Sequence, residues 1–299
     1  MAVGTYFRET RPQFLLLTPA CVAVGVGTAA WVKGGLGALT WGYVALAFFG
    51  AVCAHIATNV LNDYFDYTSG LDLKTKRTPF SGGSGILPAR LMSAQAALVF
   101  GLVALALTAA IGIFFIAVRG WGILPLGLLG LIVIVIYTPL ITKRPLLCLI
   151  APGLGFGPLM VMGTHFALTG SYDCVAVLAS IPPGFLVSNL LLLNQFPDVE
   201  ADASINRYHI PIAFGRRASA WLYAAFALGT YVWIFCCWAF GAFPLGTLIA
   251  LIPLPLALVT VKGVIKNADN IKKLVPFLGQ NVIYTLTTPL LLGIGFMIA

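Results

Sequence analysis

Residues 93–117 form the stretch SAQAALVFGLVALALTAAIGIFFIA, which contains no charged side chain. A run of about 20 apolar residues is what one helix needs to cross the hydrocarbon core of a bilayer. Irregular backbone is excluded there, because lipid satisfies no backbone hydrogen bond. This stretch therefore predicts a transmembrane helix, and it defines the pattern to look for in the rest of the chain.

Similar apolar runs recur along the chain and predict about nine transmembrane helices in all. The others cover residues 14–32, 41–61, 121–139, 146–168, 174–193, 219–240, 246–264 and 275–298. Of the 299 residues, 60% are hydrophobic and only 9% are charged, whereas a soluble domain carries about 25% charged residues. We therefore expect an all-α integral membrane protein with the lipid bilayer as its solvent. No linker divides the chain, so residues 1–299 are predicted to form a single domain.

Basic residues are distributed unevenly between alternate loops. If the N-terminus is cytoplasmic, all of the 17 Lys and Arg residues except Lys33 and Arg119 fall on the cytoplasmic side. The positive-inside rule explains this asymmetry, so the net charge of +8 implies no nucleic-acid partner. The first span begins near residue 14 with no transit peptide before it, which favours a prokaryotic plasma membrane.

Acidic residues are concentrated in two short windows. Of the nine Asp and Glu residues, all but Glu9, Asp173 and Asp269 lie in NDYFDYTSGLD at 62–72 or in NQFPDVEAD at 194–202. Each window follows the predicted cytoplasmic end of an apolar run, where carboxylates oppose the helix dipole. Such a concentration of acids at two helix ends indicates a binding site rather than solvated loops.

The spacing of these acids predicts a divalent-cation site. Asp63 and Asp66 are three residues apart, and Asp198 and Asp202 are four apart, so each pair is expected to share one helical face. Like charges at that distance repel unless a cation lies between them. Carboxylate and amide oxygens suit Mg²⁺ rather than zinc, and Mg²⁺ commonly bridges protein carboxylates to phosphate oxygens.

Basic residues near both windows complete a candidate diphosphate site. Lys74, Lys76 and Arg77 follow the first window, and Arg207 follows the second. Lys and Arg side chains can bind the diphosphate oxygens that the metal leaves free. The GGSG stretch at 82–85 is either a flexible segment that closes over such a ligand or a turn before the next span.

At these residues the chain resembles the UbiA superfamily of intramembrane prenyltransferases and looks most like its MenA branch. The first UbiA motif is of the NDxxDxxxD type. Asn62, Asp63 and Asp66 match it, while Gly70 replaces the third Asp and Asp72 follows two residues later. The stretch LLLNQFPDVEAD carries the second motif, DxxxD, and residues 137–139 and 156–164 are also similar to this branch.

The resemblance implies a ring of nine helices around a central cavity, with the Asp motifs at its cytoplasmic mouth. It implies Mg²⁺-dependent transfer of a polyprenyl group from its diphosphate to 1,4-dihydroxy-2-naphthoate, on the way to menaquinone. The catalytic metal ligands would be Asp63, Asp66, Asp198 and Asp202, with Asn59, Asn62 and Asn194 completing or orienting the shells. Candidates for substrate contacts are Asp72, Lys76, Arg77, Arg207, Lys143, Arg11 and, as rings facing an allylic cation, Tyr64, Tyr67 and Tyr137.

Other acceptors stay open, because Asn206-Arg207-Tyr208 stands where MenA-like chains usually carry a Gly-Lys-Arg run. Within the superfamily, 4-hydroxybenzoate, homogentisate, a glyceryl phosphate lipid and haem B are alternatives. A secondary transporter is a more distant alternative, since intramembrane acids also mark ion-coupled carriers. Carriers place such acids near the bilayer midplane, whereas these lie at helix ends. Neither the prenyl chain length nor the oligomeric state follows from the sequence.

Overall fold

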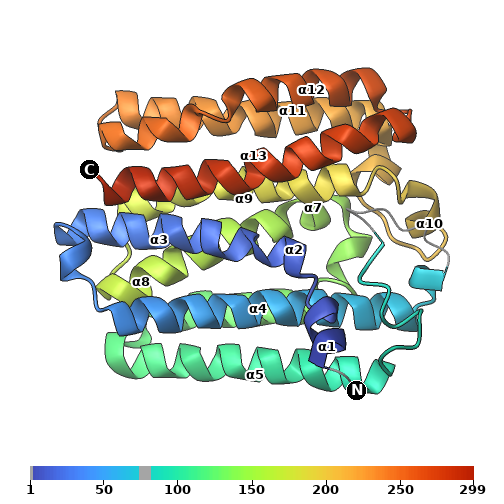
Figure 1. Cartoon of the computed structure of the whole chain (residues 1–299), viewed down its shortest axis with the longest axis horizontal. Coiled ribbons are helices and arrows are strands. Elements are labelled where there is room, and N and C mark those ends of the chain that lie inside the picture. The colour runs from blue at the N-terminus through green and yellow to red at the C-terminus, as the bar shows by residue number, and fades with distance from the viewer. Residues whose placement is uncertain (1–2, 74–81) are drawn as a thin grey trace.

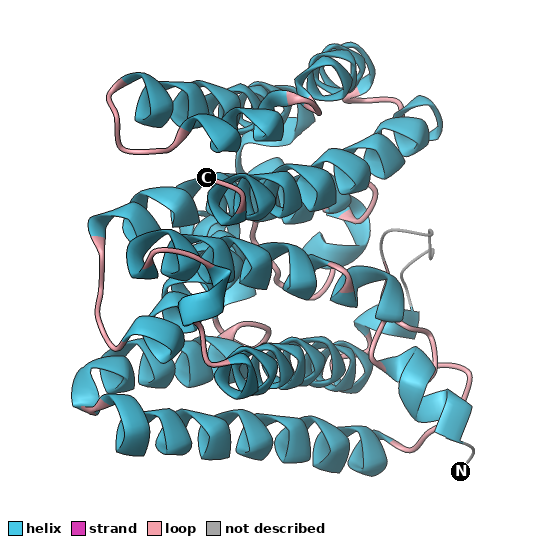
Figure 2. Cartoon of the chain, turned by 60° about the vertical axis from the view of Figure 1, so that its left-hand side comes forward, coloured by secondary structure: helices cyan, strands magenta, loops and turns pink. Residues whose placement is uncertain are grey.

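Long apolar helices make up most of the computed structural model, which describes residues 3–73 and 82–299. These described residues contain no strand (Figure 2). The helices are α1 (Val3–Glu9), α2 (Pro12–Leu15), α3 (Leu17–Lys33), α4 (Trp41–Thr68), α5 (Ala94–Arg119), α6 (Leu124–Ile136), α7 (Pro145–Leu154), η5 (Gly155–Met162), α8 (Gly163–Thr169), α9 (Cys174–Asn194), α10 (Val199–Ala203), α11 (Ile210–Ala239), η6 (Leu245–Leu251), α12 (Leu254–Asn267) and α13 (Ile271–Met297). Helices satisfy their backbone groups internally, which is what a bilayer requires.

The number of membrane crossings agrees with the sequence pattern. Within the described residues, 8 helical segments are long and apolar enough to cross a membrane. The predicted span 121–139 is present as a shorter apolar helix, Trp121–Ile136. Figure 1 shows the N-terminus and the C-terminus at opposite ends of the bundle, as an odd number of crossings requires. The predicted all-α membrane fold is confirmed.

Small residues let the helices approach each other closely. A Cβ at Gly293 of α13 would lie 2.4 Å from the backbone carbon of Ala23 in α3. A Cβ at Gly153 of α7 would lie 2.3 Å from the carbonyl oxygen of Gly184 in α9. Lipid tails are as apolar as the side chains, so van der Waals contact at such small residues, rather than the hydrophobic effect, holds membrane helices together.

An irregular helix separates α7 from α8. Residues Gly155–Met162 form the π-helix η5, which contains Pro158. Proline has no backbone N–H and its ring crowds the preceding turn, and widened turns of this kind are common at functional sites. Gly155, Phe156 and Leu159 of η5 line an internal cavity, so the irregular helix shapes a wall of the site described below.

Both acidic windows lie at one end of the bundle. The predicted span 41–61 continues as α4 to Thr68, so the first window begins within a helix rather than in a loop. Gly70, with a φ of 78°, follows the end of α4, as glycine commonly does at helix C-termini. Figure 1 shows α10, which carries part of the second window, at the same end of the bundle as the C-terminal end of α4.

Candidate active site

α4 presents three of the predicted site residues to the cavity. Asn59, Asn62 and Asp66 lie on one face of its last turns and line the cavity together. Asp63 is 1% exposed and does not line it. Of the expected pair of metal ligands, only Asp66 lines the cavity, because Arg11 and the backbone of Ser84 cover Asp63.

The second window faces the first from the end of α9. Asn194 is the last residue of α9, Asp198 immediately precedes α10, and Asp202 lies within α10. All three line the same cavity. The chain then passes through Asn206, whose φ of 62° is in the left-handed region, and Arg207 after it also lines the cavity.

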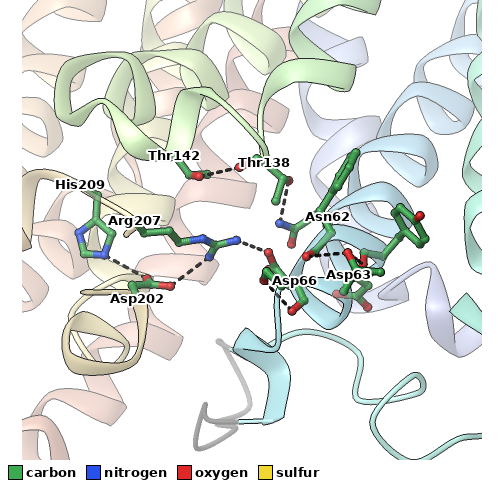
Figure 3. Close-up of polar contacts among 12 residues, drawn as sticks. Asn62, Asp63, Asp66, Thr138, Thr142, Asp202, Arg207 and His209 are labelled. Atoms are coloured by element: carbon green, nitrogen blue, oxygen red, sulfur yellow. Dashed lines mark hydrogen bonds and ion pairs between the residues drawn. The ribbon is translucent and has the colours of Figure 1, made fainter. Parts of the chain in front are cut away.

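Arg207 joins the two windows (Figure 3). One of its terminal nitrogens donates to Asp66 Oδ1, and the other donates to Asp202 Oδ1 at 3.1 Å. The second carboxylate oxygen of Asp202 lies 3.0 Å from Nε2 of His209. Burial lowers the pKa of Arg207, but the carboxylates of Asp66 and Asp202 outweigh burial and raise that pKa above its usual value. The guanidinium therefore stays charged and balances two buried acids.

Arg11 reaches the first window from the N-terminal segment. Its guanidinium donates to Asn62 Oδ1 at 2.9 Å and also to Asp63 Oδ1. The other oxygen of Asp63 accepts a hydrogen bond of 3.0 Å from the backbone N–H of Ser84. Asp63 thus ties both Arg11 and the segment that contains Ser84 to α4.

Gly83 brings the main chain against these carboxylates. A Cβ at Gly83 would lie 2.9 Å from Asp63 Oδ1 and 3.4 Å from Asp72 Oδ1. The residue also has a φ of +69°, a conformation that glycine adopts without steric cost. Both the space and the backbone conformation therefore favour glycine. Closure of residues 82–85 over a ligand stays a prediction.

Two further acids lie beside the site away from water. Glu9 at the end of α1 is fully buried and accepts a hydrogen bond of 2.6 Å from the Ser84 hydroxyl. Burial raises the pKa of Glu9 in spite of Ser84 and the positive charge of Arg11. Burial, followed by the negative charge of Asp66, raises the pKa of Asp72 to about 7. Carboxylates crowded together in a dry environment behave in this way.

Several buried polar atoms around the mouth of the cavity have no hydrogen-bond partner in the described part of the chain. They are Glu9 Oε1, Arg11 Nε, Asp72 Oδ2, Asn194 Oδ1 and His209 Nδ1. Native proteins leave few buried polar atoms unsatisfied, so this concentration indicates a site that receives a further polar ligand.

The donor chemistry of the mouth fits a hard divalent cation. Its unsatisfied oxygens belong to carboxylates and an amide, which are the ligands that Mg²⁺ binds. Across residues 3–73 and 82–299, no three His, Cys, Asp or Glu side chains are grouped closely enough to hold an ion as they stand. Arg11 pairs with Asp63, and Arg207 pairs with Asp66 and Asp202, so these guanidinium groups balance the charge of three of the carboxylates.

The cavity behind the mouth has a volume of about 720 Å³. Away from the charged residues its wall is mainly apolar and includes Ile111, Phe115, Leu126, Leu131 and Met160. This volume lies within the range of about 300–1,000 Å³ found for ligand pockets. A charged mouth and an apolar interior suit an amphiphile whose anionic head stays at the mouth while its hydrocarbon tail extends inward.

The profile of the UbiA prenyltransferase family matches residues 16–281, a range that includes both acidic windows. The chain belongs to the UbiA prenyltransferase family. The superfamily and the enzyme class predicted from the motifs are confirmed, and the chain is an integral membrane prenyltransferase. The alternative of a secondary transporter is thereby removed.

Relatives of this UbiA chain support the resemblance to the MenA branch. A protein from Bacillus subtilis named 1,4-dihydroxy-2-naphthoate octaprenyltransferase is 25% identical over 221 residues, covering 73% of this chain and 70% of the relative. A protein of the same name from Escherichia coli is 25% identical over 306 residues, covering 98% of this chain and 95% of the relative.

Solved structures show the same fold at lower identity. A UbiA homologue from Archaeoglobus fulgidus bound to GPP and Mg²⁺ has a TM-score of 0.64 at 15% identity, covering 99% of this chain and 100% of that one. Digeranylgeranylglyceryl phosphate synthase has a TM-score of 0.69 at 14% identity, covering 99% of both chains. The UbiA-like arrangement of helices predicted from the motifs is confirmed by this similarity of fold.

The UbiA site residues predicted from the sequence divide into three groups. Those that line the cavity are Arg11, Asn59, Asn62, Asp66, Asp72, Tyr137, Asn194, Asp198, Asp202 and Arg207. Four others are described but do not line it: Asp63, which lies behind Arg11, together with Tyr64, Tyr67 and the exposed Lys143. Lys76 and Arg77 lie outside the described residues.

Sequence reasoning did not include Glu9, Thr138 or His209 in this site. The Thr138 hydroxyl accepts a hydrogen bond of 3.0 Å from the side-chain amide of Asn62. Glu9 is far from both windows in the sequence, and only folding of the N-terminal segment onto Ser84 reveals its position. For His209, its place two residues after Arg207 was the one available signal.

Proposed function

We propose that this UbiA enzyme transfers a polyprenyl group from its diphosphate to 1,4-dihydroxy-2-naphthoate, with Mg²⁺ as the cofactor. The observation that carries the proposal is the Arg207 bridge between Asp66 and Asp202 at the charged mouth of an apolar cavity. The names of the relatives support the choice of acceptor. In this proposal residues 1–299 act as one domain in a prokaryotic plasma membrane, with the mouth facing the cytoplasm.

The acids and amides of the two windows are proposed to hold the cation. These are Asp63, Asp66, Asp198 and Asp202 with Asn59, Asn62 and Asn194. A bound divalent cation supplies positive charge that stabilises the diphosphate as it departs. When the carboxylates are balanced in this way, the guanidinium groups of Arg11 and Arg207 become available for diphosphate oxygens. Lys76 and Arg77 are proposed to assist them, and Asp72 contributes at the same mouth.

The reaction breaks the allylic C–O bond of the prenyl diphosphate and the bond between the acceptor ring and its carboxylate, and it forms one new C–C bond. The allylic C–O bond breaks and its electron pair leaves on the diphosphate, which Arg11 and Arg207 stabilise by hydrogen bonding. The electron-rich ring of the acceptor then forms the new C–C bond to the prenyl carbon. Loss of the acceptor carboxylate as CO₂ returns an electron pair to the ring, which balances the charge of the departing diphosphate.

Apolar walls keep water away from the allylic cation before the ring reaches it. Tyr137 is the one tyrosine of the three predicted that lines the cavity. The hydroxyl of Tyr137 is neutral at neutral pH, as is usual for tyrosine. The neutral ring is proposed to face the cation and stabilise it through a cation–π interaction.

Purified enzyme supplied with Mg²⁺, geranylgeranyl diphosphate and 1,4-dihydroxy-2-naphthoate should form a demethylmenaquinol, which mass spectrometry detects directly or, after oxidation by air, as the demethylmenaquinone. Asp66→Asn and Asp202→Asn should abolish the product, and EDTA should do the same until Mg²⁺ is restored. Glu200→Gln is the matched control, because its carboxylate is exposed and paired with Arg216 away from the cavity wall. Product only from 4-hydroxybenzoate, homogentisate, haem B or a glyceryl phosphate lipid would retain the prenyltransferase and replace the acceptor.

A further inference from the structure

His55 is a buried imidazole in the cavity wall that the reaction described above does not use. It lies on α4 on the same face as Asn59, Asn62 and Asp66, at helical spacings of four, seven and eleven residues. The side chain lines the cavity although the residue is only 5% exposed. Two helical turns, about 11 Å, separate His55 from Asn62, so the imidazole belongs to the interior of the cavity rather than to its mouth.

Thr18 determines which nitrogen of His55 carries the proton. The Thr18 hydroxyl lies 2.8 Å from His55 Nδ1 and is fully buried on α3. It has no other hydrogen-bond partner in the described part of the chain. If Nδ1 were the donor, the hydroxyl proton of Thr18 would be buried without an acceptor, which is unfavourable. The Thr18 hydroxyl therefore donates to Nδ1, and the neutral imidazole carries its own proton on Nε2.

The Nε2–H group of His55 is available to donate a hydrogen bond to a ligand in the cavity. Nε2 makes no hydrogen bond to the described residues, and it is not sealed away from the cavity space. The ring also packs edge-to-face with Phe156 of η5, with ring centroids 4.7 Å apart at an angle of 77°. A fixed donor in a mainly apolar chamber selects for an oxygen atom at that position.

Two threonines of the cavity wall, Thr58 and Thr108, do not offer the same donor. The hydroxyl of Thr58 donates to the Ala54 carbonyl, and that of Thr108 donates to the Ala104 carbonyl, as is common for threonine inside helices. Both residues line the cavity with these hydroxyl protons already engaged. His55 is therefore a better placed donor than Thr58 or Thr108.

We propose that His55 Nε2–H donates a hydrogen bond to an oxygen of the aromatic acceptor and orients its ring toward the prenyl carbon. This inference rests on the proposed function. A prenyl tail at this depth would leave the N–H without a partner. The diphosphate is proposed to bind Arg11 and Arg207, whose partners Asn62 and Asp66 lie about two or more turns from His55 along α4. An acceptor ring between the two positions brings its oxygen to His55 and a reactive carbon to the allylic end.

The test separates acceptor binding from diphosphate binding. His55→Leu should raise the KM for the acceptor about tenfold, the effect of losing one hydrogen bond of typical strength, and leave the Kd for geranylgeranyl diphosphate and Mg²⁺ unchanged. His55→Gln, which can still present an N–H donor, should recover most of the acceptor affinity. Thr18→Val, which removes the group that sets the tautomer, should give an intermediate KM.

Each possible result of these measurements either supports or contradicts the role of His55 in acceptor binding. An unchanged acceptor KM in His55→Leu, or a rise in the Kd for the prenyl diphosphate alone, would overturn the role of His55 while the proposed function stands. Equal losses in His55→Leu and His55→Gln would also overturn it, since they would indicate a packing role. If wild-type enzyme prenylates a different aromatic acceptor, the same comparison is made with that acceptor. If no aromatic acceptor is prenylated by the wild type, the proposed function fails and this inference fails with it.

Discussion

A single guanidinium organises the acidic part of the site. Asp66 and Asp202 come from segments far apart in the sequence, and both are buried. Two such anions would oppose folding through desolvation and mutual repulsion unless a positive charge balanced them. Arg207 supplies that charge by contacting both carboxylates. The same arginine is proposed to bind diphosphate, so stability and function are coupled at this residue.

Replacing Arg207 should therefore affect stability in a way that depends on metal. Removing one partner of a buried ion pair costs about 3–5 kcal/mol, so Arg207→Gln should lower Tm by several degrees in EDTA. Mg²⁺ should reduce the difference in Tm between Arg207→Gln and wild type, because a cation can balance the charge of the same carboxylates. Thermal unfolding in detergent with and without Mg²⁺ measures both effects.

The control for this prediction is Arg217→Gln. Arg217 pairs with Asp269 on the surface, where both side chains are largely exposed, and such pairs contribute about 0–1 kcal/mol. Its Tm should stay close to that of wild type in either condition. An Arg207→Gln variant equally destabilised in EDTA and in Mg²⁺ would show that the carboxylates do not bind the cation.

Asp72 predicts a pH dependence of the metal-free protein. Its pKa rises from 3.8 to about 7 in the folded chain, first through burial and then through the charge of Asp66. Between these two values the native state holds a proton that the unfolded state has released, so the contribution of Asp72 to stability falls as the pH rises. In EDTA, the Tm of wild type should decline between about pH 4 and pH 7 more steeply than that of Asp72→Asn. Parallel Tm profiles for the two proteins would contradict this assignment.

At the level of secondary structure, the positions of the acidic residues in the site depend on where the helices end. α4 ends at Thr68 and is followed by Gly70, after which the 3-10 turn Leu71–Leu73 carries Asp72. Residues after 82 return to α4, where the backbone of Ser84 donates to Asp63. The first window is thus a helix end covered by a returning segment, and the close approach of that segment requires glycine at position 83.

Gly83→Ala should impair the site much more than Gly70→Ala. Both residues have positive φ, at +69° and +78°, so both substitutions introduce similar backbone strain. A Cβ at Gly83 meets Asp63 Oδ1 at 2.9 Å, whereas one at Gly70 meets nothing within 4 Å. We expect Gly83→Ala to weaken binding of geranylgeranyl diphosphate at least about tenfold relative to Gly70→Ala, measured by titration with Mg²⁺ present. Equal weakening in the two variants would locate the cause in backbone strain rather than in the site.

At the scale of the molecule, the helical bundle separates its two ends chemically. The mouth gathers acids and arginines, while the opposite end carries a different set of contacts. There His165 bonds Thr28 through Nδ1, at 2.9 Å, and Asp173 through Nε2, at 2.7 Å. The hydrogen bond from His165 lowers the pKa of Asp173. These hydrogen bonds join α3, α8 and the start of α9, so they indicate a structural role in stabilising the end of the bundle away from the cavity mouth.

The predicted orientation can be tested with a pair of single cysteines. Lys33 ends α3 at one side of the bundle, and Lys143 lies between α6 and α7 at the other. Both residues are exposed. In a Cys174→Ser background, which removes the exposed native thiol, a membrane-impermeant maleimide should label Lys33→Cys in intact cells. It should label Lys143→Cys only after the membrane is opened. The reverse pattern would place the acidic windows on the outside.

The membrane fold and the identity of most polar residues in the site follow from the amino-acid sequence alone. Apolar runs of spanning length leave helices as the main solution in lipid, and α5 (Ala94–Arg119) closely follows the run at 93–117. Acids are so rare in this chain that Asp66, Asp198 and Asp202 stood out, and all three line the cavity. Local composition is enough for such inferences, because the cost of placing charge in lipid does not depend on the details of packing.

Which side chains face each other depends on how the helices pack in three dimensions. Folding places Asp63 against Arg11, brings Glu9 against Ser84, and leaves Lys143 outside the cavity wall. It also pairs Thr18 with His55, two residues on different helices. The rotation of each helix about its own axis, and the approach of the N-terminal segment, depend on packing between distant parts of the chain. Sequence spacing describes one helix at a time and carries no information about its partner.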